Sequence, residues 1–570
     1  LTRNAFTAAE QKIIEDGAFR PEVDFITKDL QKWFDQVHNH GVWACAGVGI
    51  VGIATGNKEY VDMALYGIAK DGKRGFIAQM DNLFSPDGYY TEGPYYVRYA
   101  ILPYYLFANA LHHARPALKI FEHRDRILQK ALHAGLQQTN ENGRFFPLND
   151  AIREKDYTTN EMVTAIGIAW NVYGPDDGLL YMAKQQKKVL LNKGGASIAA
   201  AVAARGNGVT KFPYKTVHYR DGAKGNEGGL SLLRAGNATL IYKYTAHGLS
   251  HGHFDKLHIG LYDQGNEILT DYGSVRFVNV EQKYGGRYLP ENDTWSAQTI
   301  AHNTIVVDET SHFNGDERLG GQHPAELFYK AADSFAQVVS ATADDAYNDV
   351  ALHRTVYLVN LPNRQRFVLD VFRATSGGTH QYDLPFHFSG QPINTSFKYT
   401  PFTNQLQTLG AKNGYQFLWK EAEAAVKDTT VQFTFLNGQT YYTISSLIQD
   451  SARLFFARTG ANDPSFNMRR EPCFIIRKTG GPQTFVNVVE MHGRYDAVME
   501  FSTNAYPKVQ KIALLRNDQK YTVMSIAMGD KVLLVAQSND NNSPGQKHSL
   551  AVDADTIQWQ GPYYYKLINL

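Results

Sequence analysis

The stretch that decides the fold is residues 229–244, GLSLLRAGNATLIYKY, where the hydrophobic period shifts to two. Two strands are predicted there, on either side of Ala235-Gly236-Asn237. A second hairpin is predicted from residues 257–262 and 267–271, around Gln264-Gly265. Short strand-like runs continue to the C-terminus without helix-length segments between them, so we predict an antiparallel β-sandwich rather than a parallel sheet.

Before about residue 210 the apolar residues recur at helical spacing. Residues 42–55 are apolar on nearly all sides and rich in Ala and Gly, which indicates a buried helix that ends near Gly56. Residues 58–80 are amphipathic, and residues 95–113 are again apolar. Because buried and amphipathic helices alternate, we predict stacked helix pairs in two layers, as in a toroid.

The composition limits the classes of function. The chain has 570 residues, and 57 Lys and Arg balance 56 Asp and Glu, which argues against a nucleic-acid partner bound by bulk charge. Two cysteines, Cys45 and Cys473, provide neither a disulfide framework nor a Cys-based zinc site. No apolar run is long enough for a membrane span. The 34 Tyr, 31 Phe and 6 Trp suit a carbohydrate ligand.

A histidine cluster is the sharpest local signal. Four histidines fall in the twelve residues HGLSHGHFDKLH: His247, His251, His253 and His258. With Asp271 and His302 they predict a zinc site, and the alternative is a solvated or hydrogen-bonded sheet edge. The predicted hairpin places Asp271 opposite His258, so geometry alone favours His258 as a ligand. His253 reaches Asp271 only if the chain bends before Leu257.

A rival motif overlaps this cluster. His251-Gly252-His253-Phe254-Asp255 resembles the dinuclear zinc motif of the metallo-β-lactamase-like hydrolases. Lys256 stands where that motif has its third histidine, and a cation is wrong for a metal ligand. This interpretation is therefore disfavoured.

A second group of candidates lies mostly in the helical half. Asn39-His40-Gly41 precedes the buried helix, and its position alone favours Asn39 as a helix N-cap over a functional role. The segment YYTEGPYYVRY, residues 89–99, contains Tyr96 and Arg98 at a loop-to-helix entry, where an aromatic staple around Pro94 is the structural alternative. Tyr288 falls in a loop of the β half.

Together these segments resemble the heparinase II/III-like polysaccharide lyases, and most closely the alginate and oligoalginate lyases of polysaccharide lyase family 17. The matching segments span about residues 39–305 in the family's order. The resemblance implies an α+β multidomain chain, with an incomplete (α/α) toroid over residues 1–205 and an antiparallel β-sandwich domain over residues 206–570. The helical region is short for this family, so we expect an N-terminal helical part outside the quoted chain.

The resemblance also assigns roles. Asn39 and His40 match the pair that faces the substrate carboxylate. Tyr288 matches the tyrosine that transfers a proton, and Tyr96 and His251 match further catalytic positions. The resemblance also gives the metal ligands. His253, Asp271 and His302 match the family's zinc ligands and would hold one structural zinc ion, and no organic cofactor is expected. Arg98 and Arg276 are candidates to bind uronate carboxylates, with structural ion pairs as the alternative.

The resemblance implies β-elimination on alginate or its oligosaccharides, with cleavage at chain ends. A heparan-sulfate-type lyase is the alternative, and the net charge of +1 leans against it. A non-catalytic sugar-binding protein is less favoured. By analogy we expect a periplasmic or secreted protein, and a homodimer is among the expected assemblies.

Overall fold

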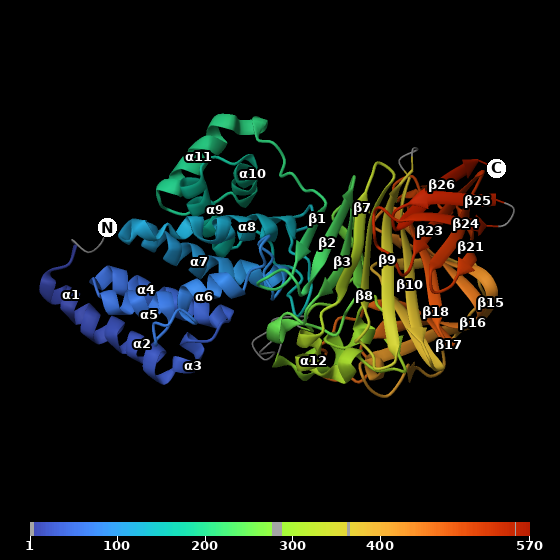
Figure 1. The fold of residues 1–570 in the computed structure, drawn as a ribbon, viewed down its shortest axis with the longest axis horizontal. Helices are drawn as coiled ribbons and strands as arrows, with labels where there is room; N and C mark the ends of the chain where they lie inside the picture. Colours follow the sequence, from blue (N-terminus) through green and yellow to red (C-terminus); the bar gives the residue numbers. More distant parts are fainter. Residues whose placement is uncertain (1–4, 276–287, 362–364, 553–554, 570) are drawn as a thin grey trace. The chain divides into compact units, whose positions relative to one another are not determined.

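The computed structural model describes residues 5–275, 288–361, 365–552 and 555–569. The chain divides into two compact units, Leu1–Glu227 and Gly228–Leu570 (Figure 1). The predicted domain boundary at residues 205 and 206 falls at the end of α11 (Lys193–Arg205). The first unit ends with a short strand, β1 (Val217–Arg220).

The first unit is helical, as the period of its apolar residues predicts. Its α-helices before α11 are α1 (Ala8–Ile14), α2 (Arg20–Asp24), α3 (Gln31–Phe34), α4 (Asn39–Thr55), α5 (Lys58–Tyr66), α6 (Gly75–Asn82), α7 (Pro94–Ala114), α8 (His123–Gln137), α9 (Asn160–Tyr173) and α10 (Asp177–Gln186). Helix α4 is the buried helix expected from its composition, and Gly56 ends it with φ of +76°. A Cβ on Gly49 would lie 2.1 Å from the ring of Phe107, so glycine lets α7 approach α4 closely.

One helix prediction needs correction. Residues 58–80 form two helices, α5 and α6, because the intervening chain takes left-handed conformations at Gly67 (φ +85°) and Gly72 (φ +72°). Gly75, with φ of +81°, then starts α6 against the backbone of Leu65, where a Cβ would lie 2.7 Å from the carbonyl carbon. No helix of the described residues is both long and apolar enough to span a bilayer.

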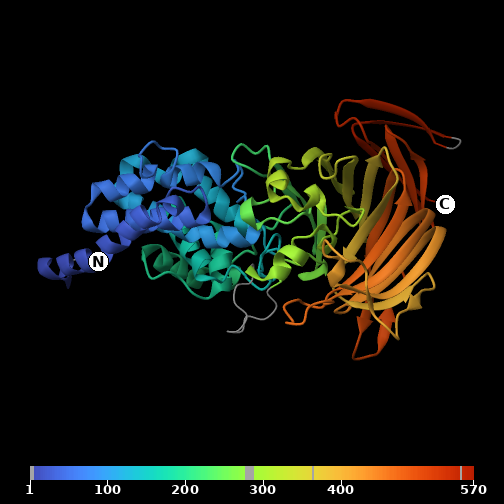
Figure 2. The ribbon, with the colours of Figure 1, turned by 90° about the horizontal axis from the view of Figure 1, so that it is seen from below.

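The second unit is built of antiparallel sheets. One sheet has the order β2-β3-β4-β5, from β2 (Gly228–Ala235), β3 (Ala238–Thr245), β4 (His258–Asp263) and β5 (Asn266–Leu269). The large curled sheet has the order β6-β11-β17-β16-β18-β10-β9-β8-β7, and β15 extends it beside β16. Figure 2 shows its long orange strands β15 (Leu418–Asn437) and β16 (Thr440–Thr459), which pair along nearly their whole length.

The remaining elements of the second unit complete this arrangement. The other strands of the large sheet are β6 (Val306–Val307), β7 (Glu326–Ala332), β8 (Ala336–Ala343), β9 (Val350–Asn360), β10 (Arg366–Ser376), β11 (His380–His387), β12 (Gln391–Thr395), β13 (Thr400–Pro401), β14 (Gln407–Thr408), β17 (Pro472–Gly480) and β18 (Gln483–His492). Outside it lie α12 (Glu317–Gln322), β19 (Arg494–Asp496), β20 (Phe501–Thr503), β21 (Val509–Asn517), β22 (Tyr521–Met528), β23 (Lys531–Ser538), β24 (Lys547–Val552), β25 (Asp555–Gln560) and β26 (Tyr563–Asn569). Strands β21, β22, β23 and β26 form a four-stranded sheet, whereas β19–β20 and β24–β25 are separate hairpins.

The strands of the second unit pack in three layers. Alternate residues of β10 enter different cores: Val368 and Phe372 pack with the β2–β5 sheet, whereas Leu369 and Val371 pack with the four-stranded sheet. This is the period of two expected for a strand buried on both faces. Figure 1 shows the same order, with β10 between β3 and the red strands.

The predicted hairpin and the predicted bend are both present. Strands β4 and β5 turn at Gln264 and Gly265, with φ of +52° and +78°. Leu257, immediately before β4, takes φ of +62°. A left-handed conformation costs a branched residue energy, so the surrounding packing must enforce this bend.

Candidate functional site

The first candidate cluster surrounds the start of α4 in the helical unit. His38, not Asn39, caps this helix: its Nδ1 accepts a hydrogen bond from the backbone N–H of His40 at 3.3 Å. The backbone N–H of His38 donates to Oε1 of Gln79 at 2.9 Å. The alternative in which Asn39 acts as the N-cap is therefore wrong, and its side chain is available for another role.

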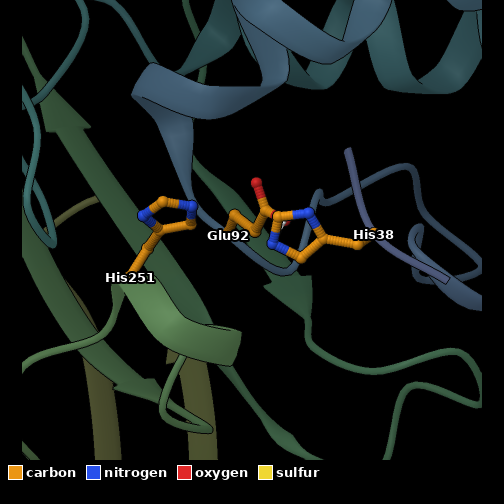
Figure 3. A group of neighbouring side chains, drawn as sticks. All are labelled: His38, Glu92 and His251. Atoms are coloured by element: carbon orange, nitrogen blue, oxygen red, sulfur yellow. Dashed lines mark ion pairs between the residues drawn. The ribbon is translucent and has the colours of Figure 1, made fainter. Parts of the chain in front are cut away.

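Glu92 lies behind this helix start and is completely buried. Its Oε2 accepts a hydrogen bond from Nδ2 of Asn39 at 2.7 Å, and its Oε1 lies 3.6 Å from Nε2 of His38 (Figure 3). Because Nδ1 of His38 is an acceptor, the neutral ring has its proton on Nε2 and points it toward Glu92. The carboxylate thus holds the Asn39 amide and faces the His38 ring.

This contact fixes the orientation of the Asn39 amide. A carboxylate only accepts hydrogen bonds, so the amide must turn its NH₂ group toward Glu92. One N–H is committed there, and the second remains for another acceptor. The Asn39 Oδ1 is buried and accepts no hydrogen bond from the described residues. His40, the next residue, is exposed, and its ring lies 5.6 Å from that of Trp33.

The tyrosine-rich segment forms the entry of α7. Pro94 occupies the first turn, and Tyr96 is half-buried with its ring edge-on to Tyr95 at 4.8 Å. Nη1 of Arg98 donates to Oε1 of Glu161 at 2.8 Å, and its guanidinium lies 4.7 Å from the ring centre of Tyr95. Arg98 therefore forms a structural ion pair, which was the alternative to its binding a uronate carboxylate.

The second cluster belongs to the β unit and could hold a metal ion. His253, Asp271 and His302 are buried, and one potential ligand atom of each lies within 4.8 Å of the others. Both ring nitrogens of His253, Oδ2 of Asp271 and Nδ1 of His302 have no hydrogen-bond partner among the described residues. Buried polar atoms are rarely left unsatisfied, so this convergence fits a bound cation.

The other atoms of these side chains are oriented by hydrogen bonds. Nε2 of His302 donates to the carbonyl of Ser296 at 2.9 Å, which leaves the Nδ1 lone pair facing Asp271. Oδ1 of Asp271 accepts from the backbone N–H of Gly273 at 3.0 Å. Such outer contacts are typical of metal sites because they fix the ligand tautomer.

His258 lies beside this cluster but in a different state. Its Nδ1 accepts a hydrogen bond from the backbone N–H of Asn303 at 3.0 Å. The neutral ring therefore carries its proton on Nε2, which lies 3.4 Å from Oδ2 of Asp271. His258 thus points an N–H toward Asp271 without completing a hydrogen bond, and His253 is the better candidate ligand. The bend at Leu257 allows this arrangement.

Electrostatics keep the cluster ready to bind a cation. Burial lowers the pKa of His253 to about 3, so the ring is neutral at neutral pH. Burial alone would raise the pKa of Asp271, but His302 and His258 hold it below its usual range. Asp255 lies 4.0 Å from Nδ1 of His302, so it adds negative charge beside the site.

Two lysines next to the cluster are buried and fully engaged. Nζ of Lys243 donates to Oδ2 of Asp255 at 2.6 Å. Nζ of Lys256 donates to the carbonyls of Thr245 and Gly320, at 2.9 and 3.1 Å. Lys256 is therefore a structural cation at the position where the metallo-β-lactamase motif requires a ligand.

Three further predicted site residues, His251, Tyr288 and Arg276, belong to the β unit. His251 ends the 3₁₀-helix η7 (Leu249–His251) and is buried; its ring is drawn in Figure 3. Tyr288 is 79% exposed, and Arg276 lies outside the described residues. Sequence reasoning missed Glu92 and His38, although Glu92 stands in the quoted YYTEGPYYVRY segment. A glutamate directly before a helix start is the only signal it gave.

The helical unit followed by antiparallel sheets is similar in fold to the heparinase II/III-like polysaccharide lyases. Residues 218–482 match the family model for the heparinase II/III-like C-terminal region, and residues 2–146 match the alginate lyase model. A heparan sulfate lyase from Pedobacter heparinus has a similar fold, with a TM-score of 0.61 at 14% identity, covering 89% of this chain and 67% of that one. Heparinase III gives a TM-score of 0.59 at 13% identity, covering 88% and 67%.

Two relatives define the family more narrowly. An alginate lyase from Stenotrophomonas maltophilia is 41% identical over 567 residues, which is 98% of this chain and 76% of the relative. An exo-oligoalginate lyase from Saccharophagus degradans is 40% identical over 571 residues, with the same coverage. The chain therefore belongs to the alginate and oligoalginate lyase family.

Proposed function

We propose that this protein cleaves alginate or alginate oligosaccharides by β-elimination, releasing unsaturated uronate from chain ends. The observation that carries the proposal is the match along 98% of the chain to an alginate lyase and an exo-oligoalginate lyase. The heparan-sulfate-type alternative has weaker support, because the neighbours of that kind share only the fold at 12–15% identity.

The reaction needs a stabilised carboxylate. The C5–H bond breaks, a C4–C5 double bond forms and the C4–O4 bond breaks. Negative charge then builds on the uronate carboxylate, which is a poor electron sink unless hydrogen-bond donors meet it. The second N–H of Asn39 is such a donor, and the start of α4 adds the positive end of a helix dipole. His40 is the proposed partner of Asn39.

Glu92 is proposed as a positioning residue for this donor. By accepting one N–H of Asn39 it keeps the amide from flipping, so that an N–H rather than the oxygen faces a bound carboxylate. A preorganised donor stabilises developing charge without reorientation during the reaction. Its two contacts, at 2.7 and 3.6 Å, tie the residue pair at 38 and 39 to one buried anion.

Two proton transfers complete the elimination. Tyr288 is proposed to protonate O4 and also to serve as base where the C5 proton lies on its side. Tyr96 or His251 would take the proton of the other epimer. Each transfer of this kind is worth roughly 10²–10⁴-fold in rate. Arg98 and Arg276 are proposed to bind uronate carboxylates, although Arg98 would have to share its guanidinium with Glu161.

The metal proposed for the β unit is one zinc ion per chain, held by His253, Asp271 and His302. Bound there, zinc would brace the chain between β4 and the segment after β5, and no proton transfer is assigned to it. We further propose a periplasmic or secreted location and a homodimer, both by analogy with the family.

A substrate panel tests the activity. Poly-mannuronate, poly-guluronate and heparan sulfate are incubated with the protein, and ultraviolet absorbance reports the new double bond. We expect a rising signal on an alginate polymer or its oligosaccharides; silence on both alginate polymers would end the proposal. Tyr288→Phe should abolish turnover, whereas Tyr399→Phe, at another exposed tyrosine, should leave it intact.

A further inference from the structure

A polar groove lies at one end of the large sheet in the β unit. Two adjoining cavities form it, with volumes of about 400 and 770 Å³, and both are lined by Met491, His492 and Gly493. The smaller one extends to the β4–β5 turn and the start of β16, and the larger one follows the chain after β20. Volumes of this size are typical of small-molecule sites.

The groove is rich in cations that lack acidic partners. Arg366 and Arg494 line the smaller cavity and Lys508 the larger one. Their known contacts are with neutral groups: Nη1 of Arg366 donates to the carbonyl of Ala235, and Nη2 of Arg494 donates to Oε1 of Gln439 at 2.9 Å. Among the described residues, no ion pair includes any of these three cations.

The nearby carboxylates are already occupied. Asp263, the one acidic residue among those described that line the cavities, accepts hydrogen bonds from Tyr442 and Gln264 at 3.0 and 3.3 Å. Glu490 is buried, and it accepts from the backbone N–H groups of Lys508 and Val509. The exposed balance of the groove is therefore positive.

The floor of the groove is rigid. His492 donates from Nδ1 to the carbonyl of Asn504 at 2.9 Å, and its Nε2 accepts from the hydroxyl of Thr443 at 2.8 Å. Gly493 has φ of +61°, and a Cβ there would lie 2.3 Å from the Asn504 carbonyl oxygen. Beside this floor Tyr506 is 78% exposed, which leaves an aromatic face on the wall.

We propose that this groove is a second, non-catalytic binding site for a uronate oligosaccharide. Each uronate carries a carboxylate, which a guanidinium can bind through two parallel hydrogen bonds. The apolar face of a sugar ring can stack on Tyr506. Two adjoining cavities with cations in both suit several linked residues better than a single anion. The choice of a uronate rests on the proposed function, but the positive groove does not.

Such a site would hold a long chain that is also being degraded. Linking two binding events on one polymer raises the local concentration of chain ends, so affinity for polymer would exceed that for a short oligomer. The site should therefore affect polymer and trisaccharide differently, and this difference separates it from the active site.

Calorimetry with an alginate tetrasaccharide tests the proposal in full-length protein carrying Tyr288→Phe. We expect about two binding sites per chain, and about one after adding Arg494→Ala and Lys508→Ala. In wild-type background the same pair should raise KM for polymer about 5-fold and leave trisaccharide turnover within about 1.5-fold. Both side chains are exposed, so folding should persist.

The matched control removes two exposed lysines outside the groove, Lys330→Ala and Lys547→Ala. This control pair lowers the net charge by the same two units as the groove pair. It should alter neither the number of tetrasaccharide sites per chain nor the KM for polymer. Equal effects of both pairs, or no effect of the groove pair, would overturn the proposal. Equally tight binding of a neutral tetrasaccharide, which carries no carboxylate, would overturn the uronate assignment. Absent lyase activity would instead reject the proposed function, since calorimetry still reports the groove.

Discussion

The two buried clusters, one in each unit, differ in how their polar atoms are satisfied. In the β unit the lone pairs of His253, Asp271 and His302 converge without donors among the described residues. In the helical unit Oε2 of Glu92 accepts a hydrogen bond from Asn39, and Oε1 lies 3.6 Å from Nε2 of His38. Several converging lone pairs without donors fit a bound cation, whereas a carboxylate that accepts a hydrogen bond from one neighbour and faces a second is placed to orient them. The β-unit cluster should therefore matter to stability, and the helical-unit cluster to turnover.

Removing the metal should give the largest effect on stability. At a metal concentration of about 1,000 Kd, binding contributes roughly 4 kcal/mol to the free energy of unfolding. Chelation or His253→Ala should lower the urea midpoint accordingly, with metal content measured by mass spectrometry. His247→Ala, at a buried histidine of the same segment, should keep the metal. Loss of activity with unchanged stability would instead indicate a catalytic metal.

Asn39→Ala should give the largest effect on turnover. Loss of one preorganised donor to a developing oxyanion typically lowers kcat by about 10²–10³-fold. Asn57→Ala is the matched control, because Oδ1 of Asn57 caps α5 by accepting from the N–H of Tyr60. That control should cost about 1 kcal/mol of stability and leave kcat unchanged. Comparable kcat in the two variants would remove Asn39 from the site.

Glu92→Gln should lower kcat by about 10- to 100-fold, as misplacement of a catalytic group does. The side-chain amide of glutamine has one oxygen and one NH₂ group, so its NH₂ group must face either the Asn39 amide or the His38 ring. Either the Asn39 amide then turns over or the contact with His38 is lost. In the double variant with Asn39→Ala, the glutamine should add almost nothing, since Glu92 acts through Asn39. Additive losses in kcat would show that Glu92 acts independently of Asn39.

Periodicity predicted much of this structure, because it reports which faces are buried. The β2–β3 hairpin and helix α4 are near the predicted residues. The single helix predicted over residues 58–80 was wrong, since apolar spacing does not reveal left-handed backbone at Gly67 and Gly72. The break between α5 and α6 is therefore set by the local backbone conformation and not by which residues are buried.

The candidate residues were harder to rank from sequence. Spacing favoured His258 as the ligand because an extended chain was assumed, and a single left-handed residue, Leu257, brings His253 to Asp271 instead. The role proposed for Glu92 depends on its burial and on contacts 53 residues away in sequence, which no local pattern contains. The roles assigned by resemblance to Tyr288, Tyr96 and His251 stay predictions.

His258→Gln tests the tautomer argument with a smaller effect. If His258 only donates to Asp271, the variant should still bind one metal ion per chain, with affinity reduced about tenfold, as for other outer-shell contacts. Competition with a chelator of known affinity measures this. Complete loss of metal, equal to that of His253→Ala, would show that His258 is itself a ligand.

The half-buried His353, outside both clusters, tests whether desolvation of a histidine, rather than metal binding, causes acid sensitivity. Burial, with nearby Arg373, lowers the pKa of His353 to about 3, and its Nε2 lies 2.7 Å from the Ser340 hydroxyl. The unfolded chain binds a proton near pH 6.5, so this contribution to stability is complete above that pH and is lost as pH falls toward 3. His353→Gln should reduce the slope of unfolding free energy by at most about 1.4 kcal/mol per pH unit below 6.5, without changing metal content. An unchanged slope in urea titrations would assign the acid sensitivity to other groups, of which the metal ligands are the first to examine.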